Sequence, residues 1–256
     1  MAIISLEMSS YCNKNCSICS RSVEQKHEDI HMSRETFHNF ANNLDSGIMI
    51  SCHGRGESSC NPLFDEFVIY LKSLGMFLVI DTNAINLNLN VGFKKFDTIT
   101  VSTFKDDVIW KSQLENMNKF LLNPCHPRLL IRINGDVGEE RDSMYRKLVG
   151  DMNIVYRDLH SVNGSVDYST NKPIIPEHGM CLELLNHPVV WADGSVSTCI
   201  RWDKDKKRVI GNVNEQPMKS IMVNPKRIQM IKEHILMGTS KYCKDCEYRG
   251  IPVVSR

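Results

Sequence analysis

Residues 11–19 read Tyr-Cys-Asn-Lys-Asn-Cys-Ser-Ile-Cys and closely follow a short apolar segment. The spacing of Cys12, Cys16 and Cys19 is that of a single loop wrapped around one metal cluster. Three thiolates on a 4Fe-4S cluster leave the fourth iron open, and an open iron can bind and activate a small molecule. The loop therefore predicts an iron-sulfur cluster with one free coordination position.

A zinc site is the alternative explanation for these cysteines. Structural zinc takes four ligands, so a fourth would have to lie close by. The nearest candidates are His27 and His31, and both stand in a charged stretch. Three cysteines so close together are rarely a coincidence, and we favour the cluster.

The composition is typical of an enzyme from a reducing compartment. The chain has 256 residues, a formal net charge of +1 and 10 cysteines. The near-neutral net charge gives no indication of nucleic-acid binding. No apolar run is long enough to cross a bilayer, and the N-terminus lacks a signal-peptide pattern. We therefore expect a cytoplasmic protein with no nucleic-acid or membrane partner, whose cysteines serve metal or redox chemistry rather than disulfides.

Short apolar runs alternate with helical patterns, which indicates β-α-β units and a parallel sheet. The predicted strands cover residues 3–8, 48–53, 76–81, 98–102, 129–134 and 152–156. The predicted helices start at an N-cap Ser33 and at Asn61-Pro62, and cover residues 106–121 and 140–149. Six such strands are too few for a closed eight-stranded barrel but enough for an open one. Right-handed crossovers would bring their carboxyl ends, and the cysteine loop, to one rim.

Other candidate site residues follow the predicted strands on that rim. The second strand leads into residues 53–58, His-Gly-Arg-Gly-Glu-Ser, and the third into Thr82-Asn83-Ala84. Ser102 ends the fourth strand, and Arg132 and Asn134 lie on the fifth. Without a ligand these residues would form an ordinary turn and strand-end caps. His53 could act as an acid or base in the cleft.

A second cysteine set lies in the C-terminal part of the chain. It consists of Cys181, Cys199, Cys243 and Cys246. Four thiolates suffice for a fully ligated iron-sulfur cluster. A four-cysteine zinc site would share the spacing, although a zinc ribbon usually pairs two short Cys-x-x-Cys knuckles and the first two of these cysteines lie far apart. We therefore favour a second cluster.

Polar residues crowd together at 157–177, which predicts a boundary between domains at residues 1–165 and 166–256. Beyond it, a β-hairpin is expected to turn at Asp193-Gly194. Residues 218–237 predict a helical segment that restarts at a proline and ends before a glycine. The expected inward face of that helix consists of Ile228, Ile231 and Ile235.

The first cysteine motif resembles the signature of the radical S-adenosylmethionine (SAM) superfamily. The resemblance implies that SAM chelates the open iron through its amino and carboxylate groups. Reductive cleavage would then release a 5'-deoxyadenosyl radical that abstracts a substrate hydrogen. It also implies a partial (β/α)6 TIM-like barrel and an electron donor of the flavodoxin or ferredoxin type.

The same resemblance implies residues that bind SAM. Gly56 and Glu57 stand in register with the family's Gly-Gly-Glu-Pro segment, although Arg55 interrupts the glycines and a serine replaces the proline. Thr82 and Asn83 look like the start of the family's Thr-Asn-Gly turn with the glycine lost. The implied contacts are completed by Ile18, Ser102, Arg132 and Asn134.

The C-terminal half resembles the Twitch domain, a shortened SPASM domain that is a small α+β unit with one auxiliary 4Fe-4S cluster. Two 4Fe-4S clusters and SAM are thus the expected cofactors. The short chain looks most like the aminocyclitol (2-deoxy-scyllo-inosamine) dehydrogenase group, which oxidises a secondary alcohol to a ketone. The segment that links the two halves lacks the arginine expected to contact such a substrate. Arg55, Arg157 and Arg201 could substitute for it.

Two alternatives stay open. One is a peptide-modifying radical SAM maturase that cross-links, oxidises or epimerises a peptide. Such enzymes often carry an N-terminal leader-recognition domain, and a chain that begins directly with its first strand favours a small molecule or a peptide presented by another protein. The other is a non-catalytic iron-sulfur electron carrier, which would explain the cysteines but not the glycine-glutamate segment or the barrel.

Overall fold

Strands in parallel register build most of the structure, a computed structural model that describes residues 3–17, 19, 21, 28–157, 181–200 and 206–243. The first six strands are β1 (Ile3–Leu6), β2 (Met49–Cys52), β3 (Phe77–Thr82), β4 (Thr98–Phe104), β5 (Arg128–Asn134) and β6 (Ile154–Arg157). Each pairs in parallel with the next along the chain. All six predicted strands are confirmed, with ends that differ by one or two residues.

Three more strands extend the same sheet into the C-terminal half. They are β7 (Val189–Val190), β8 (Ser195–Ser197) and β9 (Val209–Asn212). The sheet order is β6-β5-β4-β3-β2-β1-β7-β8-β9, with β7 parallel to β1 and the last two pairs antiparallel. The pairing of β7 with β1 was not predicted, and it makes the two halves of the chain share one sheet.

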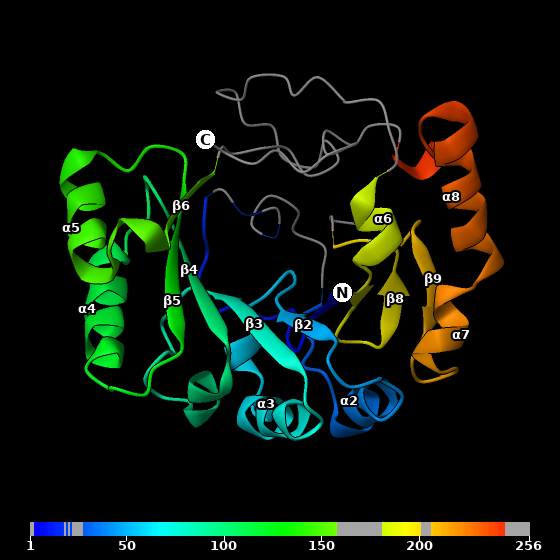
Figure 1. Cartoon of the computed structure of the whole chain (residues 1–256), viewed down its shortest axis with the longest axis horizontal. Coiled ribbons are helices and arrows are strands. Elements are labelled where there is room, and N and C mark those ends of the chain that lie inside the picture. Colours follow the sequence, from blue (N-terminus) through cyan, green and yellow to red (C-terminus); the bar gives the residue numbers. More distant parts are fainter. Residues whose placement is uncertain are drawn as a thin grey trace.

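Helices lie along the outer side of the curved sheet (Figure 1). The α-helices are α2 (Arg34–Ala41), α3 (Phe64–Ser73), α4 (Trp110–Leu121), α5 (Glu139–Val149), α6 (Leu182–Asn186), α7 (Met218–Met222) and α8 (Pro225–Met237). The 3-10 helices are η1 (Ser58–Cys60), η2 (Val91–Lys95), η3 (Asp151–Asn153) and η4 (Lys241–Cys243). This mostly parallel α/β architecture with a small C-terminal α+β part confirms the partial barrel predicted from the sequence.

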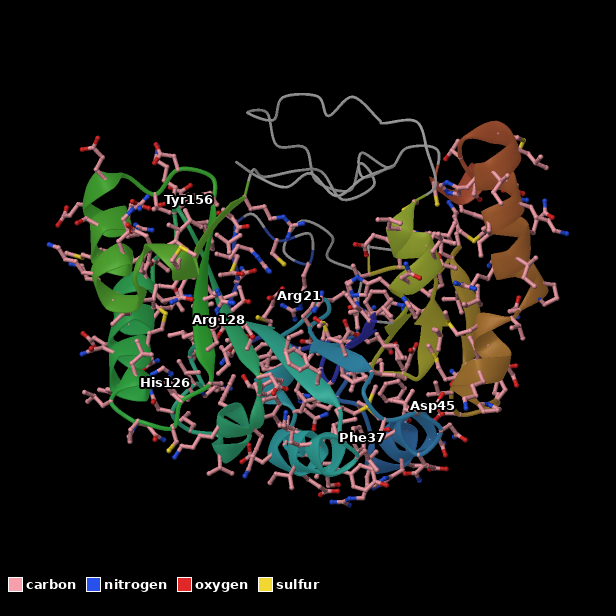
Figure 2. The ribbon with its side chains drawn as sticks, in the orientation of Figure 1. Arg21, Phe37, Asp45, His126, Arg128 and Tyr156 are labelled. Carbon is pink, nitrogen blue, oxygen red and sulfur yellow. The ribbon has the colours of Figure 1, made fainter. Side chains whose placement is uncertain are left out.

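The two faces of the sheet differ in polarity because strand residues alternate between them. Ile4, Ile50 and their equivalents on β3 to β5 join the helices in one apolar core. Within it Phe37 of α2, labelled in Figure 2 on the helix side of the sheet, stacks on Phe67 of α3, with ring centroids 4.0 Å apart. The alternate positions carry Ser5 and Ser51, so the concave face is polar.

The predicted cap at Ser33 is confirmed, whereas α3 and α4 start later than predicted, α4 at Trp110 instead of residue 106. The Ser33 side chain accepts a hydrogen bond from the backbone N–H of Thr36, as expected for an N-cap. The next helix, α3, begins at Phe64 instead of Asn61-Pro62. The Asn61 side-chain oxygen accepts from the backbone N–H of Leu63 over 2.8 Å, and its amide donates to the carbonyls of Met8 and Met32, which holds Asn61 in the loop before the helix.

The predicted C-terminal elements are found, but α8 turns a different face inward. The hairpin turns at Gly194, with φ of 83°, and α8 ends at a left-handed Gly238. The predicted inward face was wrong, since Ile228 is 40% and Ile235 is 66% exposed. The buried face of α8 instead carries Met230, Glu233 and His234. On this face the Glu233 carboxylate accepts from the backbone N–H of Lys241, in the turn after the helix.

The predicted division into residues 1–165 and 166–256 stays a prediction, because the boundary lies outside the described residues. In the described part of the chain, no helix is long and apolar enough to cross a membrane.

A left-handed alanine provides a test of the turn after β3. Ala84 is fully buried and has φ of 61°, at the position where the family pattern has glycine. A Cβ in this region costs about 1 kcal/mol, and the buried methyl contributes about 0.8 kcal/mol in return. Ala84→Gly should therefore change the free energy of unfolding by less than about 1 kcal/mol, measured by anaerobic chemical denaturation.

The matched control is buried Ala41, which has helical geometry in α2. Ala41→Gly loses both helix propensity and a buried methyl and should cost about 1 to 2 kcal/mol. Equal losses at the two positions would contradict the strain assigned to Ala84.

Candidate functional site

The three N-terminal cysteines lie in the loop that leaves the carboxyl end of β1. Cys12, Cys16 and Cys19 are each partly buried, and the backbone N–H of Cys19 donates to the carbonyl of Cys16 over 3.1 Å. Burial raises the pKa of Cys12 and raises the pKa of Cys16 to about 12, and the charge of Cys19 acts in the same direction. Thiols of this kind stay protonated until a metal displaces the proton.

No three His, Cys, Asp or Glu side chains converge as ligands of a single metal ion within the described ranges. A cluster makes a different demand on the loop, because each of its thiolates binds a different iron. The three cysteines on one short loop fit that donor set.

Side chains from neighbouring strands fix the cysteine loop. Lys14 donates to Asp107 over 2.5 Å, and both side chains are buried. Asn83 donates to the Asn13 side chain over 2.8 Å and to the Cys12 sulfur over 3.8 Å. Hydrogen bonds to cluster sulfurs tune the electronic properties of such centres. Asn83, predicted to contact SAM, therefore lies against a predicted cluster ligand.

The two glycines after β2 are required by contacts inside the protein. A Cβ at Gly54 would lie 2.6 Å from the Glu7 side chain. A Cβ at Gly56 would lie 2.3 Å from the Tyr11 carbonyl oxygen, at the start of the cysteine loop. The Glu57 backbone N–H donates to that same carbonyl over 2.9 Å. Gly56 thus holds two rim loops together, and its contact with SAM stays a prediction.

Glu57 is a buried carboxylate, 3% exposed, with no cation beside it among the described residues. It accepts from the Ser59 hydroxyl at 2.8 Å, the Thr82 hydroxyl at 2.9 Å and the Asn83 backbone N–H at 2.8 Å. Burial raises its pKa, and these hydrogen bonds only partly oppose that effect. Among the described residues, the carboxylate oxygen Oε2 accepts from Asn83 alone, and it retains room for another donor. A buried carboxylate of this kind fits the ammonium group of SAM.

Residues predicted on β4 and β5 line the concave face. Arg132 reaches across β4 to Asp81 on β3, with 2.6 Å between Nη1 and Oδ2. The Asn134 amide donates to the Thr103 carbonyl over 3.2 Å. Ser102 lies beside Arg132 in the strand register. The guanidinium of Arg132 is therefore paired with Asp81, and its contact with SAM stays a prediction.

Asp81 is the acidic group at the centre of this face. Burial alone would raise its pKa, but the guanidinium of Arg132 and the nearby His53 and Arg157 hold that pKa below the ordinary value. Asp81 is therefore a charged carboxylate at neutral pH. The concave face thus offers acceptors and donors side by side, as a polar ligand requires.

The second cysteine set is only partly described. Cys181 precedes α6, Cys199 follows β8, and Cys243 ends η4. Cys246 and the predicted adenine contact Ile18 lie outside the described residues, as does Arg201. Arg227 of α8 donates to carbonyls in α6, which ties the last helix to the segment that carries Cys181.

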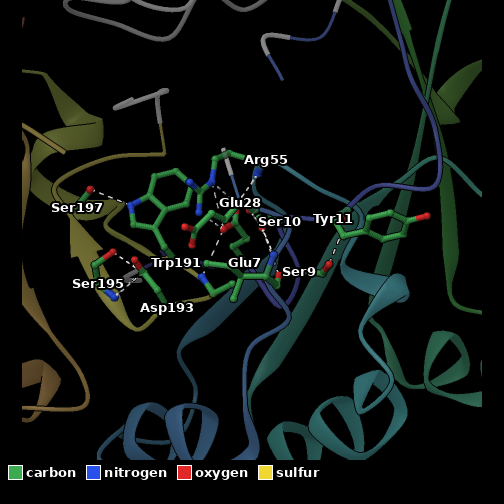
Figure 3. A network of polar contacts seen from close by, with 12 residues as sticks. Glu7, Ser9, Ser10, Tyr11, Glu28, Arg55, Trp191, Asp193, Ser195 and Ser197 are labelled. Carbon is green, nitrogen blue, oxygen red and sulfur yellow. Dashed lines mark hydrogen bonds and ion pairs between the residues drawn. The ribbon is translucent and has the colours of Figure 1, made fainter. Parts of the chain in front are cut away.

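A buried ion pair joins the two halves beside the rim (Figure 3). Glu7 is fully buried and accepts from Arg55 through Nε at 2.9 Å and from its backbone N–H at 2.6 Å. The Ala192 backbone N–H donates to the same carboxylate over 3.3 Å. The Arg55 guanidinium lies over the Trp191 ring, 4.7 Å from its centroid, and the indole N–H donates to Ser197.

Sequence reasoning missed Glu7, although a single acid in an apolar strand segment was a usable signal. Arg55 was a candidate for substrate binding, but its side chain is engaged with Glu7. The pair instead connects the loop before Glu57 with the C-terminal hairpin.

Residues 181–247 match the SPASM family, described as an iron-sulfur cluster-binding domain. The S-adenosyl-L-methionine-dependent 2-deoxy-scyllo-inosamine dehydrogenase of Niallia circulans is 26% identical over 259 residues, which cover 96% of this chain and 92% of that protein.

Two solved structures share the fold. BtrN in complex with AdoMet and 2-DOIA has a TM-score of 0.59 at 23% identity, covering 91% of this chain and 86% of that one. Streptococcus suis SuiB bound to precursor peptide SuiA has a TM-score of 0.65 at 13% identity, covering 90% of this chain and 66% of that one. Taken with the sequence matches, they confirm the resemblance that the two cysteine sets indicated.

The Glu7–Arg55 pair yields a stability prediction. Glu7→Gln leaves a largely buried guanidinium without its counter-charge and should cost about 2 to 4 kcal/mol. The control is Asp45→Asn, which breaks the exposed Lys219–Asp45 pair and should cost less than about 1 kcal/mol. Anaerobic chemical denaturation measures both. Similar small losses would show that the pair does not hold the junction.

Glu57→Gln tests the predicted ammonium contact. Losing one charge-assisted hydrogen bond costs about 1.5 to 3 kcal/mol, so SAM should bind about 10- to 100-fold more weakly in equilibrium dialysis. The exposed Glu66→Gln on α3 serves as the control, and iron content should stay unchanged in both variants. Unaltered SAM affinity in Glu57→Gln would refute the assignment.

Proposed function

We propose that the chain is a radical SAM oxidoreductase with a C-terminal iron-sulfur domain, and that it removes two electrons from a small polar substrate. The substrate class is an aminocyclitol or sugar alcohol, oxidised at a secondary alcohol to a ketone. The observation that carries the proposal is the similarity, over nearly the whole chain, to a SAM-dependent dehydrogenase of an aminocyclitol. The polar concave face, with Asp81 and Arg132 side by side, supports a ligand rich in hydroxyl or amino groups.

Two 4Fe-4S clusters and SAM are the cofactors of this proposal. The first cluster would be held by Cys12, Cys16 and Cys19. The auxiliary cluster would be held by Cys181, Cys199, Cys243 and Cys246. When bound, these groups supply a hydrogen-abstracting radical at the barrel rim and an acceptor for one electron in the C-terminal part. A flavodoxin or ferredoxin would supply the electron that starts each cycle.

The protein's own residues orient the reactants in this scheme. Glu57 would hold the SAM ammonium against the first cluster, next to Asn83. The remaining predicted SAM contacts are Gly56, Thr82, Ser102, Arg132 and Asn134. Asp81 can accept a hydrogen bond from a substrate hydroxyl or ammonium while Arg132 keeps it charged. The division at residues 1–165 and 166–256 would place the substrate between the two cluster domains.

A peptide-modifying maturase is the second candidate, favoured by the fold shared with SuiB, whose structure contains a precursor peptide. An open barrel could admit a peptide side chain as readily as a small ring. The two candidates differ in their substrate, which is a small aminocyclitol or sugar alcohol in the first and a peptide in the second. Mass analysis of the product distinguishes them.

The test is anaerobic incubation of the reconstituted enzyme with SAM, a reductant and 2-deoxy-scyllo-inosamine. The ketone, lighter by two hydrogens, and transfer of deuterium from the attacked carbon into 5'-deoxyadenosine are the expected results. About eight irons and eight sulfides should be found per chain, and about half after replacement of the three N-terminal cysteines.

Removal of the auxiliary cysteines provides the second arm. The double variant Cys243→Ala/Cys246→Ala should keep the first cluster but form no ketone. Stoichiometric zinc in place of the second cluster's iron would contradict the two-cluster scheme. A product of unchanged oxidation level would exclude the dehydrogenation.

A further inference from the structure

We propose that His53 accepts the proton that leaves the substrate hydroxyl during the oxidation. The inference rests on the proposed function, and it assigns a step that the cofactors do not perform. It is carried by the placement of His53 on the concave face and by the way two serines and a second histidine are built around it.

His53 directly follows β2 and precedes the loop that leads to Glu57. Its Nδ1 pairs with the Ser51 hydroxyl over 2.8 Å. In the tautomer in which Nδ1 donates, Nε2 is an acceptor, and Nε2 has no hydrogen-bond partner among the described residues. The imidazole is therefore oriented by the strand and keeps one basic nitrogen free.

A second histidine from the C-terminal half faces His53. The rings of His53 and His187 lie edge to face, with centroids 6.3 Å apart. His187 pairs through Nε2 with the Ser5 hydroxyl and through Nδ1 with Glu183, so both of its nitrogens are engaged. Ser5 and Ser51 are direct register partners on β1 and β2. His53 thus stands where the barrel meets the C-terminal half, and His187 cannot replace it.

Burial keeps the His53 imidazole neutral. Burial lowers its pKa, and the neighbouring His187 and Arg132 act in the same direction. Asp81 and Glu183 oppose this shift without reversing it. A neutral imidazole at neutral pH is ready to accept a proton.

Two other charged groups near this face are engaged. Asp81 is paired with Arg132, which lowers its basicity. The Arg55 guanidinium is held by Glu7. His53 therefore combines an uncharged state with an acceptor atom that has no hydrogen-bond partner among the described residues.

The proposed step balances in atoms and electrons. When bound, SAM and the first cluster would supply a 5'-deoxyadenosyl radical that takes the hydrogen atom from the carbinol carbon and leaves as 5'-deoxyadenosine. The auxiliary cluster would supply the acceptor for the unpaired electron left on that carbon, and the hydroxyl proton passes to Nε2 of His53. A ketone remains. The hydroxyl of such a radical is more acidic than that of the alcohol, so a weakly basic imidazole suffices.

The experiment compares ketone formation from 2-deoxy-scyllo-inosamine by the wild-type enzyme and by His53→Asn. Asparagine can still pair with Ser51 but offers no base. Loss of a general base lowers a rate by about 100-fold or more. His126→Gln is the control, because His126 is exposed at the outer edge of the molecule, far from the cysteine loop near Arg21 (Figure 2). Iron content verifies that each variant is folded.

A pH profile separates a base from a structural residue. The neutral imidazole is the active form, so wild-type ketone formation should be constant near neutral pH and fall only below the lowered pKa of His53. That acid limb should vanish in His53→Asn and remain in His126→Gln.

Each outcome bears on one of the two claims. Ketone formation by His53→Asn at the wild-type rate, with the acid limb retained, would overturn the role of His53 while leaving the dehydrogenation intact. A wild-type enzyme that forms no ketone from the aminocyclitol would overturn the proposed function and this step with it. Loss of ketone and of the acid limb in His53→Asn alone supports the assignment.

Discussion

The buried carboxylate of Glu7 is the constraint on which the rest of the rim depends. A carboxylate taken out of water is costly unless charge and hydrogen bonds replace its hydration. Arg55 supplies the charge, and backbone N–H groups of Arg55 and Ala192 supply further hydrogen bonds. These donors come from the loop after β2 and from the C-terminal hairpin, so satisfying one side chain brings both to the end of β1. Gly54 follows as a requirement, because a Cβ there would overlap Glu7.

The rim holds two buried acids in different states, and the difference defines the site. Glu7 has its cation within the protein, whereas Glu57 has only neutral donors among the described residues. A cationic ligand is therefore attracted to Glu57 and not to Glu7. Arg55, in place of the family's first glycine, does not reach toward that ligand. It serves Glu7 instead, which explains how the glycine-glutamate segment can depart from the family pattern and keep Gly56 and Glu57 in register.

The polarity of the sheet explains where chemistry can occur. Apolar residues face the helices, and the alternate positions place hydroxyl, imidazole, carboxylate and guanidinium groups on the concave side. The parallel pairing of β7 with β1 brings His187, just before β7, opposite His53. A substrate on this face would lie beside the cysteine loop on one side and the C-terminal half on the other. The arrangement would suit the proposed reaction, in which the substrate loses a hydrogen atom on the side of the cysteine loop and an electron on the side of the C-terminal half.

The sequence by itself determined the parts of this protein that local physics specifies. Cysteine spacing predicted a cluster loop, alternating apolar runs located the six parallel strands, and Gly194 and Gly238 marked a turn and a helix end, because each depends on neighbours along the chain. Tertiary structure decided the rest. The β1–β7 pairing, the engagement of Arg55 with Glu7 and the rotation of α8 toward Glu233 all depend on partners far apart in sequence. A buried polar group forms its hydrogen bond with whichever partner the tertiary structure places beside it. The pattern of apolar residues along the sequence does not identify that partner.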